Sequence, residues 1–166
     1  MKKRKMNKRG GILDLFVLVF VVFAFALIAI IGSRVFENAR ANLENNTQIS
    51  STNASMEILY STEDRYNNLF DGLVITIFVL LLVGVGVGAY FSNTHPAMFF
   101  ISIFVLLFVL VITAVFANTF DTMADQDSLT TAVEEFTFTS FLFDNYLLMI
   151  GVAAIIIMVL LYTRFS

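Results

Sequence analysis

Four long apolar runs dominate the pattern of hydrophobic and polar positions along this chain of 166 residues. The first, ILDLFVLVFVVFAFALIAII, covers residues 12–31 and contains one charged side chain, Asp14. Runs of similar character follow at residues 72–91, 97–117 and 146–162. A run of about 18 or more apolar residues is typical of a membrane-spanning helix. The pattern therefore predicts an all-α, polytopic membrane protein with four transmembrane helices.

Polar segments between the runs divide the chain into eight parts. We expect a basic inner tail (1–11), transmembrane helix 1 (12–33), a partly helical outer segment (34–71), transmembrane helix 2 (72–91), an inner turn (92–96), transmembrane helix 3 (97–117), an acidic outer segment (118–145) and transmembrane helix 4 (146–163). Hydrophobic residues make up 58% of the chain, against about 45–50% in soluble domains. This division leaves no room for a separate soluble domain.

Charge is distributed unevenly between the two sides of the predicted bundle. Residues 118–145 hold acidic side chains and no basic one. The positive-inside rule therefore places both termini on the cytoplasmic, or inner, side. We expect the tail to bind anionic lipid headgroups, each Lys or Arg contributing about 1 kcal/mol. Nucleic acid or an acidic inner protein is a less favoured partner that the tail charges do not exclude. The basic residues of the tail are Lys2, Lys3, Arg4, Lys5, Lys8 and Arg9.

A basic tail before an apolar run is also the layout of a cleavable signal. The run is longer than the apolar region of a usual signal peptide, and no A-x-A site follows it. Residues 8–11, KRGG, are similar to the cleavage region of archaeal pilin-like proteins. Three further spans do not suit a single-span filament subunit. We therefore expect an uncleaved signal anchor that orients the spans after it.

Charged residues at the two ends of the first span have simple structural interpretations. Asp14 lies in the first turn, where it can pair with the basic tail and with the positive end of the helix dipole. A role in proton or cation movement is the alternative. Arg34 and Glu37 are spaced i,i+3 and can pair on one helix face. We expect this helix to continue past the membrane to Ala41 or Leu43.

The two outer segments contain weaker signals. Asn53 can cap a short helix over residues 54–60, and Ser61 can begin a second helix that enters span 2. Residues 136–139, Phe-Thr-Phe-Thr, alternate as in a β-strand. This apolar segment is too short to cross the bilayer, so we expect an interfacial or re-entrant segment with its aromatic side chains in the outer leaflet. An exposed edge that pairs with a partner protein is the alternative.

Span 2 contains the clearest packing motif. Gly84 and Gly88 form a GxxxG pattern on one helix face, which lets two helix backbones approach closely. The motif predicts a contact within the bundle or between copies of the chain in a homo-oligomer. A phosphate-binding loop would need a preceding strand, which is not predicted here.

The residue types present exclude several kinds of chemistry. The chain has no Cys and one His, His95, so thiolate and His-rich metal sites are excluded. Asp121, Asp125 and Asp127 do not have the spacing of an EF-hand loop. The cores of the spans lack ionisable residues, which argues against ion-coupled transport and against intramembrane catalysis. We therefore predict a non-enzymatic protein with no cofactor and no metal site.

One resemblance follows from the layout of the spans. Residues 94–96, Thr-His-Pro, open an aromatic third span that ends at Asn118, and residues 144–145, Asp-Asn, precede the last span. This layout resembles small four-span membrane proteins of icosahedral viruses with an internal lipid membrane, although their pattern has a proline where Tyr146 or Leu147 stands. The resemblance implies a virion membrane component that links lipid to capsid or helps to deliver the genome, and it carries over no catalytic residue.

Three functional hypotheses remain. The favoured one is a structural or assembly component of a cell membrane or of an internal virion membrane, in contact with itself, other membrane proteins or capsid proteins. The second is a holin-like or channel-like pore-former, which predicts dye leakage. The third is an accessory subunit of a larger membrane complex, which predicts copurification with a catalytic subunit.

Overall fold

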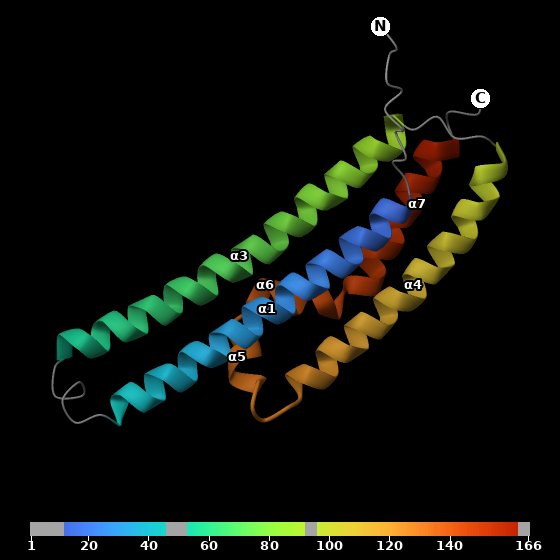
Figure 1. Cartoon of the computed structure of the whole chain (residues 1–166). Helices are drawn as coiled ribbons and strands as arrows, with labels where there is room; N and C mark the ends of the chain where they lie inside the picture. The colour runs from blue at the N-terminus through green and yellow to red at the C-terminus, as the bar shows by residue number, and fades with distance from the viewer. Residues whose placement is uncertain (1–11, 46–52, 92–95, 163–166) are drawn as a thin grey trace, which may run out of the picture.

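The computed structural model describes residues 12–45, 53–91 and 96–162, and helices account for nearly all of them. This part of the chain contains no strand, so the all-α prediction is confirmed. Figure 1 shows the helices in chain order. They are α1 (Ile12–Glu44), α3 (Asn53–Phe91), α4 (Pro96–Ala124), α5 (Thr130–Glu134), α6 (Thr137–Asp144) and α7 (Tyr146–Tyr162).

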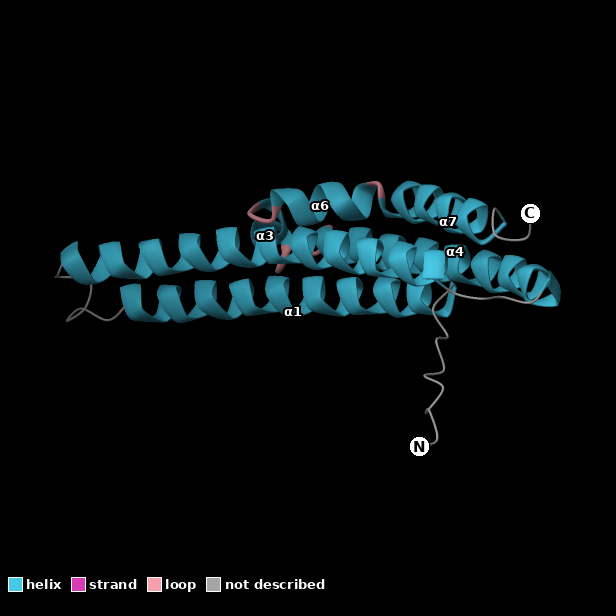
Figure 2. Ribbon diagram, turned by 90° about the horizontal axis from the view of Figure 1, so that it is seen from above, coloured by secondary structure: helices cyan, strands magenta, loops and turns pink. Residues whose placement is uncertain are grey.

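Helices α1 and α3 form a long antiparallel pair, side by side in both views (Figures 1 and 2). With 33 and 39 residues, they are about 50 and 58 Å long at 1.5 Å per residue. Both exceed the roughly 30 Å hydrocarbon core of a bilayer. The excess lies at the end where α1 finishes and α3 begins. We call this part, residues 34–44 of α1 and 53–67 of α3, the arm.

Three helices, α1, α3 and α4, are long and apolar enough to cross a membrane. The fourth predicted span differs from the other three. Helix α7 has 17 residues, or about 26 Å, and α6 precedes it at a bend of 65°. The two helices pass the same test only as a bent pair, so the structure contains three continuous candidate spans and one broken one.

The alternating residues 136–139 do not form a β-strand, because residues 137–144 form helix α6. The side chains that α6 buries are Thr139, Leu142 and Phe143. Their i, i+3, i+4 spacing is the spacing of one helix face. Burial of this face against the bundle therefore outweighs the β-propensity of four alternating residues.

Several helix boundaries extend beyond the predicted spans. Helix α1 continues past the apolar run to Glu44, close to the expected end. Helix α3 is a single helix from Asn53, and no break occurs at Ser61. Helix α4 begins at Pro96, which suits the first turn of a helix because proline has no N–H to donate.

An aromatic core fills the space where the bend between α6 and α7 meets the long helices. The rings of Phe23 and Phe116 stack at 4.2 Å between centroids, and those of Phe120 and Phe143 stack at 4.4 Å. Tyr146, the first residue of α7, is fully buried, and its hydroxyl donates a 2.8 Å hydrogen bond to the Val19 carbonyl. The bend is thus fixed to α1 by both packing and hydrogen bonding.

Candidate functional site in the arm

Buried polar side chains gather where the arm joins the apolar part of α1 and α3. A buried polar group needs a hydrogen-bond partner, because its desolvation is otherwise unfavourable. The contacts of each group therefore show which of these side chains serve the fold and which have polar atoms left without a partner. The five residues of this buried polar set are Ser33, Glu37, Glu63, Asn67 and Asp71.

Arg34 and Arg40 form ion pairs with the buried carboxylates of the arm. Arg34 pairs with Glu37 on α1, which confirms the i,i+3 pair expected from the sequence. Arg40 crosses from α1 to pair with Glu63 on α3. The two carboxylates are 8% and 5% exposed, whereas Arg34 and Arg40 are about one-third exposed at 35% and 31%. The carboxylates therefore lie inside the pair of helices and the arginines reach them from the water side.

The tip of the arm contains a second polar group. The Tyr60 hydroxyl donates a 3.0 Å hydrogen bond to Glu44, and this bond raises the pKa of Tyr60 above its usual value. The Arg40 guanidinium lies 5.1 Å above the centre of the same ring, and its Nε is 3.4 Å from Glu44. These contacts join α1 and α3 at the end farthest from the apolar spans.

Glu135 brings a third carboxylate to the arm. It follows α5 and is exposed, and Asn67 of α3 donates its side-chain N–H to it. One carboxylate oxygen each from Glu37, Glu63 and Glu135 lies within 4.8 Å of the others. Burial raises the pKa of Glu135, and the nearby charges of Glu63 and Glu37 raise it further. Three segments distant in sequence thus supply one cluster of three acidic groups, which we call the carboxylate cluster.

Three buried oxygen atoms in and beside the carboxylate cluster have no hydrogen-bond partner among the residues that the structure describes. They are Glu63 Oε1, Asn67 Oδ1 and Ser33 Oγ. Glu63 and Asn67 are each 4% exposed, and Ser33 is fully buried. Asn67 and Glu63 are one helical turn apart, as are Ser33 and Glu37, so each pair shares a helix face. The region therefore contains buried oxygen atoms that the described residues leave unsatisfied, together with one buried donor in the same state, Arg40 Nε.

Asp71 has a different role, because it caps a neighbouring helix. Its Oδ1 accepts hydrogen bonds from the backbone N–H and the hydroxyl of Thr139, both at 2.7 Å. Its Oδ2 accepts a 2.9 Å bond from the Phe138 N–H. These groups belong to the first turn of α6, where the unpaired N–H groups and the helix dipole favour a negative charge. One carboxylate of α3 therefore holds the start of α6.

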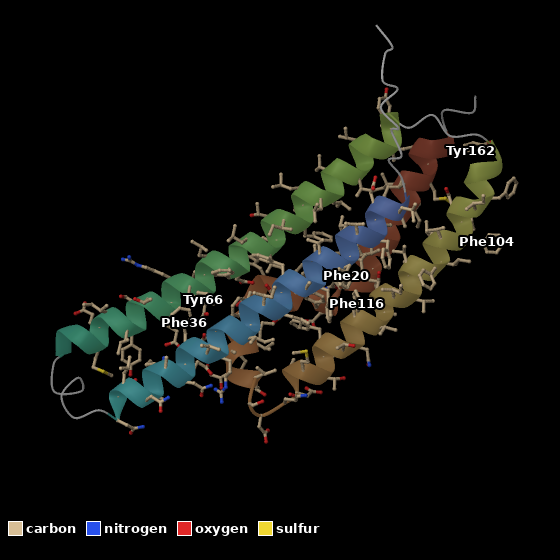
Figure 3. The ribbon with its side chains drawn as sticks, viewed as in Figure 1. Phe20, Phe36, Tyr66, Phe104, Phe116 and Tyr162 are labelled. Atoms are coloured by element: carbon tan, nitrogen blue, oxygen red, sulfur yellow. The ribbon has the colours of Figure 1, made fainter. Side chains whose placement is uncertain are left out.

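A close contact between Gly32 and Tyr66 aligns the two helices at the base of the arm. The Tyr66 hydroxyl donates a 3.3 Å hydrogen bond to the Ala29 carbonyl. A Cβ atom at position 32 would lie 2.0 Å from that hydroxyl oxygen, so any larger residue would force the Tyr66 ring to move. Figure 3 shows Tyr66 and Phe36 facing each other, with ring centres 4.7 Å apart. The Tyr66 ring also stacks on Phe70 at 4.3 Å.

Gly84, Gly88 and Asp14, which the sequence also singled out, lie away from this region. A Cβ atom built on Gly84 would have no neighbour within 4 Å in the described part of the chain, and Gly88 is half-buried. The face of α3 at Gly84 is therefore open at this position. Asp14 is half-buried in the first turn of α1. His95 and the basic tail, residues 1–11, lie outside the described residues.

Sequence reasoning missed the carboxylate cluster, although one signal for it was present. Glu63, Asn67 and Asp71 are spaced i, i+4, i+8 in a segment expected to be helical, which places three polar side chains on one face. A polar stripe that continues into an apolar span predicts burial against polar partners. The contribution of Glu135 carries no such local signal, because it depends on the fold of α5 against α1.

The chain matches no protein-family model, no curated protein and no solved structure. Its function must therefore be inferred from its own residues and their arrangement.

Proposed function

We propose that the chain is a non-enzymatic structural or assembly component of a membrane, and that the arm is the part that contacts its partners. The observation that carries this proposal is that two apolar helices, α1 and α3, continue into an arm that contains ion pairs and buried polar side chains. The arm extends about 20 Å beyond a 30 Å hydrocarbon core if α1 crosses the bilayer upright. Its two helices are joined by the Arg40–Glu63 ion pair, by the hydrogen bond from Tyr60 to Glu44 and by the contact of the Phe36 and Tyr66 rings. A pair of helices fixed in this way can hold a neighbouring protein at a defined distance from the bilayer.

The polar groups of the spans support a structural role over transport. The Thr76 hydroxyl donates a 2.7 Å bond to the Gly72 carbonyl, and the Thr113 hydroxyl donates a 2.8 Å bond to the Val109 carbonyl. Both hydroxyls thus satisfy themselves within their own helix rather than lining a polar path. Helix α4 turns an apolar face outward, with Phe104 at 74% exposure (Figure 3). Such a surface suits lipid.

The proposal includes an orientation and a set of partners. The positive-inside rule places the basic tail and both termini inside and the arm outside, in a cell membrane or an internal virion membrane. The tail binds anionic headgroups. The open face at Gly84 favours contact with a second copy or with another membrane protein. In a virion the arm would face the capsid, as the viral resemblance implies.

Site-specific photo-crosslinking in the native membrane tests this proposal. A photoreactive residue replaces exposed Asp64 in the arm or exposed Asn68 next to it, and the same photoreactive residue replaces exposed Leu80 in the apolar part of the same helix. We expect the first two positions to give a protein adduct of defined size and stoichiometry, and Leu80 to give mainly lipid adducts. Arm positions that form no protein adduct, in a chain that is inserted and abundant, would contradict the proposal.

Dye release from liposomes distinguishes the pore-forming alternative. Purified full-length chain, reconstituted at increasing protein-to-lipid ratio, is expected to retain carboxyfluorescein. Release that grows with protein content would favour a pore-former instead. Purification in mild detergent separates the third hypothesis, because an accessory subunit would copurify with one large catalytic protein.

A further inference from the structure

We propose that Asp144 is a contact site inside the membrane for a lysine or arginine in a transmembrane helix of another protein. Asp144 is the last residue of α6, at the 65° bend between α6 and α7. It is exposed, and its side chain forms no hydrogen bond or ion pair with any residue that the structure describes. The proposal rests on the assembly role proposed above and extends that role from the arm into the bilayer.

Tyr146, two residues after Asp144, lies near the middle of the apolar region that the antiparallel helices α1 and α3 share. Its hydroxyl is bonded to the Val19 carbonyl, and its ring centre lies 6.4 Å from that of Phe78. Val19 is about 10 Å along α1 from residue 12, where the apolar run of that helix begins. Phe78 is about 9 Å along α3 from residue 72, where its own run begins at the opposite side. Helix α7 therefore begins inside the hydrocarbon core when these runs cross the bilayer.

The other end of α6 keeps Asp144 on the arm side of the bilayer midplane. Asp71 of α3 accepts the hydrogen bonds that cap the first turn of α6. Asp71 is about 10 Å along α3 from Phe78. Asp144 comes after this cap and shortly before Tyr146, so it lies between the levels of Asp71 and Phe78. Its short side chain cannot extend to the headgroups as lysine and arginine side chains do.

The exposed side chains nearest to Asp144 in the sequence are apolar. Helices α6 and α7 lie along one side of the bundle (Figure 2). The exposed fractions of Phe141, Leu147 and Leu148 are 55%, 47% and 66%. A carboxylate on a surface that otherwise suits lipid is unfavourable, and charged groups within spans usually face a partner. The surface around Asp144 therefore suits a contact that supplies the opposite charge.

The end of α6 favours a cation independently of the carboxylate. The last turn of a helix has carbonyl groups without partners in the helix, and the negative end of the helix dipole lies there. No basic residue occupies the last turn of α6. The Asn145 side chain donates a 2.9 Å hydrogen bond to one of these carbonyls, that of Phe141. An incoming lysine or arginine would thus meet a carboxylate and a negative helix end at the same point.

A second copy of the chain cannot supply this cation from its own spans. Residues 12–33, 66–91 and 97–163 contain no Lys, Arg or His. The remaining basic residues belong to the tail, the arm, the inner turn and position 164. Charge complementarity therefore points to a different protein, with its lysine or arginine on the arm side of the midplane.

Energy transfer in phosphatidylcholine vesicles tests the proposal with a defined probe. The full-length chain carries a donor fluorophore at its N-terminus, and the acceptor is a polyleucine transmembrane peptide with one lysine on one side of its midpoint. An all-leucine peptide is the reference. We expect the lysine peptide to associate about tenfold more tightly than the reference, because a polar contact inside a bilayer is worth this much. Equal association of the two peptides with the folded wild-type chain would overturn the proposal.

Asp144→Asn should reduce association of the lysine peptide to the level of the reference. Asp125→Asn is the matched control, because it removes the same charge from an exposed residue just after α4. Full association with Asp144→Asn, or an equal loss with Asp125→Asn, would overturn the proposal. Energy transfer between labelled copies of the chain that Asp144→Asn abolishes would identify a second copy as the partner and would also overturn it. The arm takes no part in this assay, so its result is separate from the photo-crosslinking test of the arm.

The depth of the site has its own test. A spin label at Phe141→Cys reports on the end of α6 without altering Asp144, and a label at Asp125→Cys is the reference in water. We expect oxygen to relax the label at 141 and a water-soluble nickel chelate to relax the label at 125. Relaxation of the label at 141 mainly by the nickel chelate would place Asp144 in water and overturn the proposal.

Discussion

Replacing Asp71 with alanine should release the start of helix α6 from α3. The substitution removes three hydrogen bonds of 2.7–2.9 Å, two of them to fully buried Thr139. Loss of a helix cap costs about 0.5–2 kcal/mol. A buried donor left without a partner adds about 1–3 kcal/mol. We therefore expect the free energy of unfolding to fall by about 3 kcal/mol.

Reversible unfolding in mixed micelles, followed by far-UV circular dichroism, measures this change. Hydrogen exchange adds a local test, because amides of α6 should lose protection before those of α1. The matched control is Asp144→Ala at the other end of α6, where the carboxylate is exposed and faces the negative end of the dipole. That control should be neutral or slightly stabilising. An Asp71→Ala chain within about 0.5 kcal/mol of wild type would refute the capping role.

Three further predictions follow from other contacts. Gly32→Ala should destabilise the fold by about 1–3 kcal/mol through overpacking against Tyr66, and in a double-mutant cycle of unfolding energies the penalty should shrink when Tyr66→Ala is also present. Tyr146→Phe should lower the free energy of unfolding by about 1 kcal/mol, because it removes a buried hydrogen bond; an unchanged value would show that this bond contributes nothing. Glu135→Gln should raise the melting temperature, because it removes a repelling charge beside Glu37 and Glu63; a lowered melting temperature would contradict this.

The sequence predicts the long helices well because lipid leaves the backbone few alternatives. An apolar run such as residues 12–31 must satisfy its backbone hydrogen bonds internally, so helix is the expected form. Pro96, the single proline, begins α4, and this boundary also has a local cause, because proline has no N–H and suits the first turn of a helix. The i,i+3 pair of Arg34 and Glu37 depends only on helix geometry and was also predicted. Each of these features is decided by neighbours in the sequence.

Features that depend on distant residues were not predicted. Residues 136–139 alternate as a strand does, yet a carboxylate 67 or 68 positions away in the sequence caps them as a helix. Likewise, Gly32 was not singled out, because its requirement for glycine comes from Tyr66 on another helix. The GxxxG motif stood out in the sequence, yet Gly84 has open space beside it. Local patterns therefore located the helices, and contacts between helices define the candidate site.

The central claim is that apolar helices cross the bilayer and the arm continues from them into water. Because the chain has no cysteine, single cysteines can be spin-labelled without background. Asp64→Cys probes the arm, and Val79→Cys and Phe104→Cys probe exposed positions of the spans. In liposomes, we expect the label at 64 to be relaxed mainly by a water-soluble nickel chelate and the labels at 79 and 104 mainly by oxygen. A lipid-like profile at 64, or a water-like profile at 79 and 104, would contradict the claim.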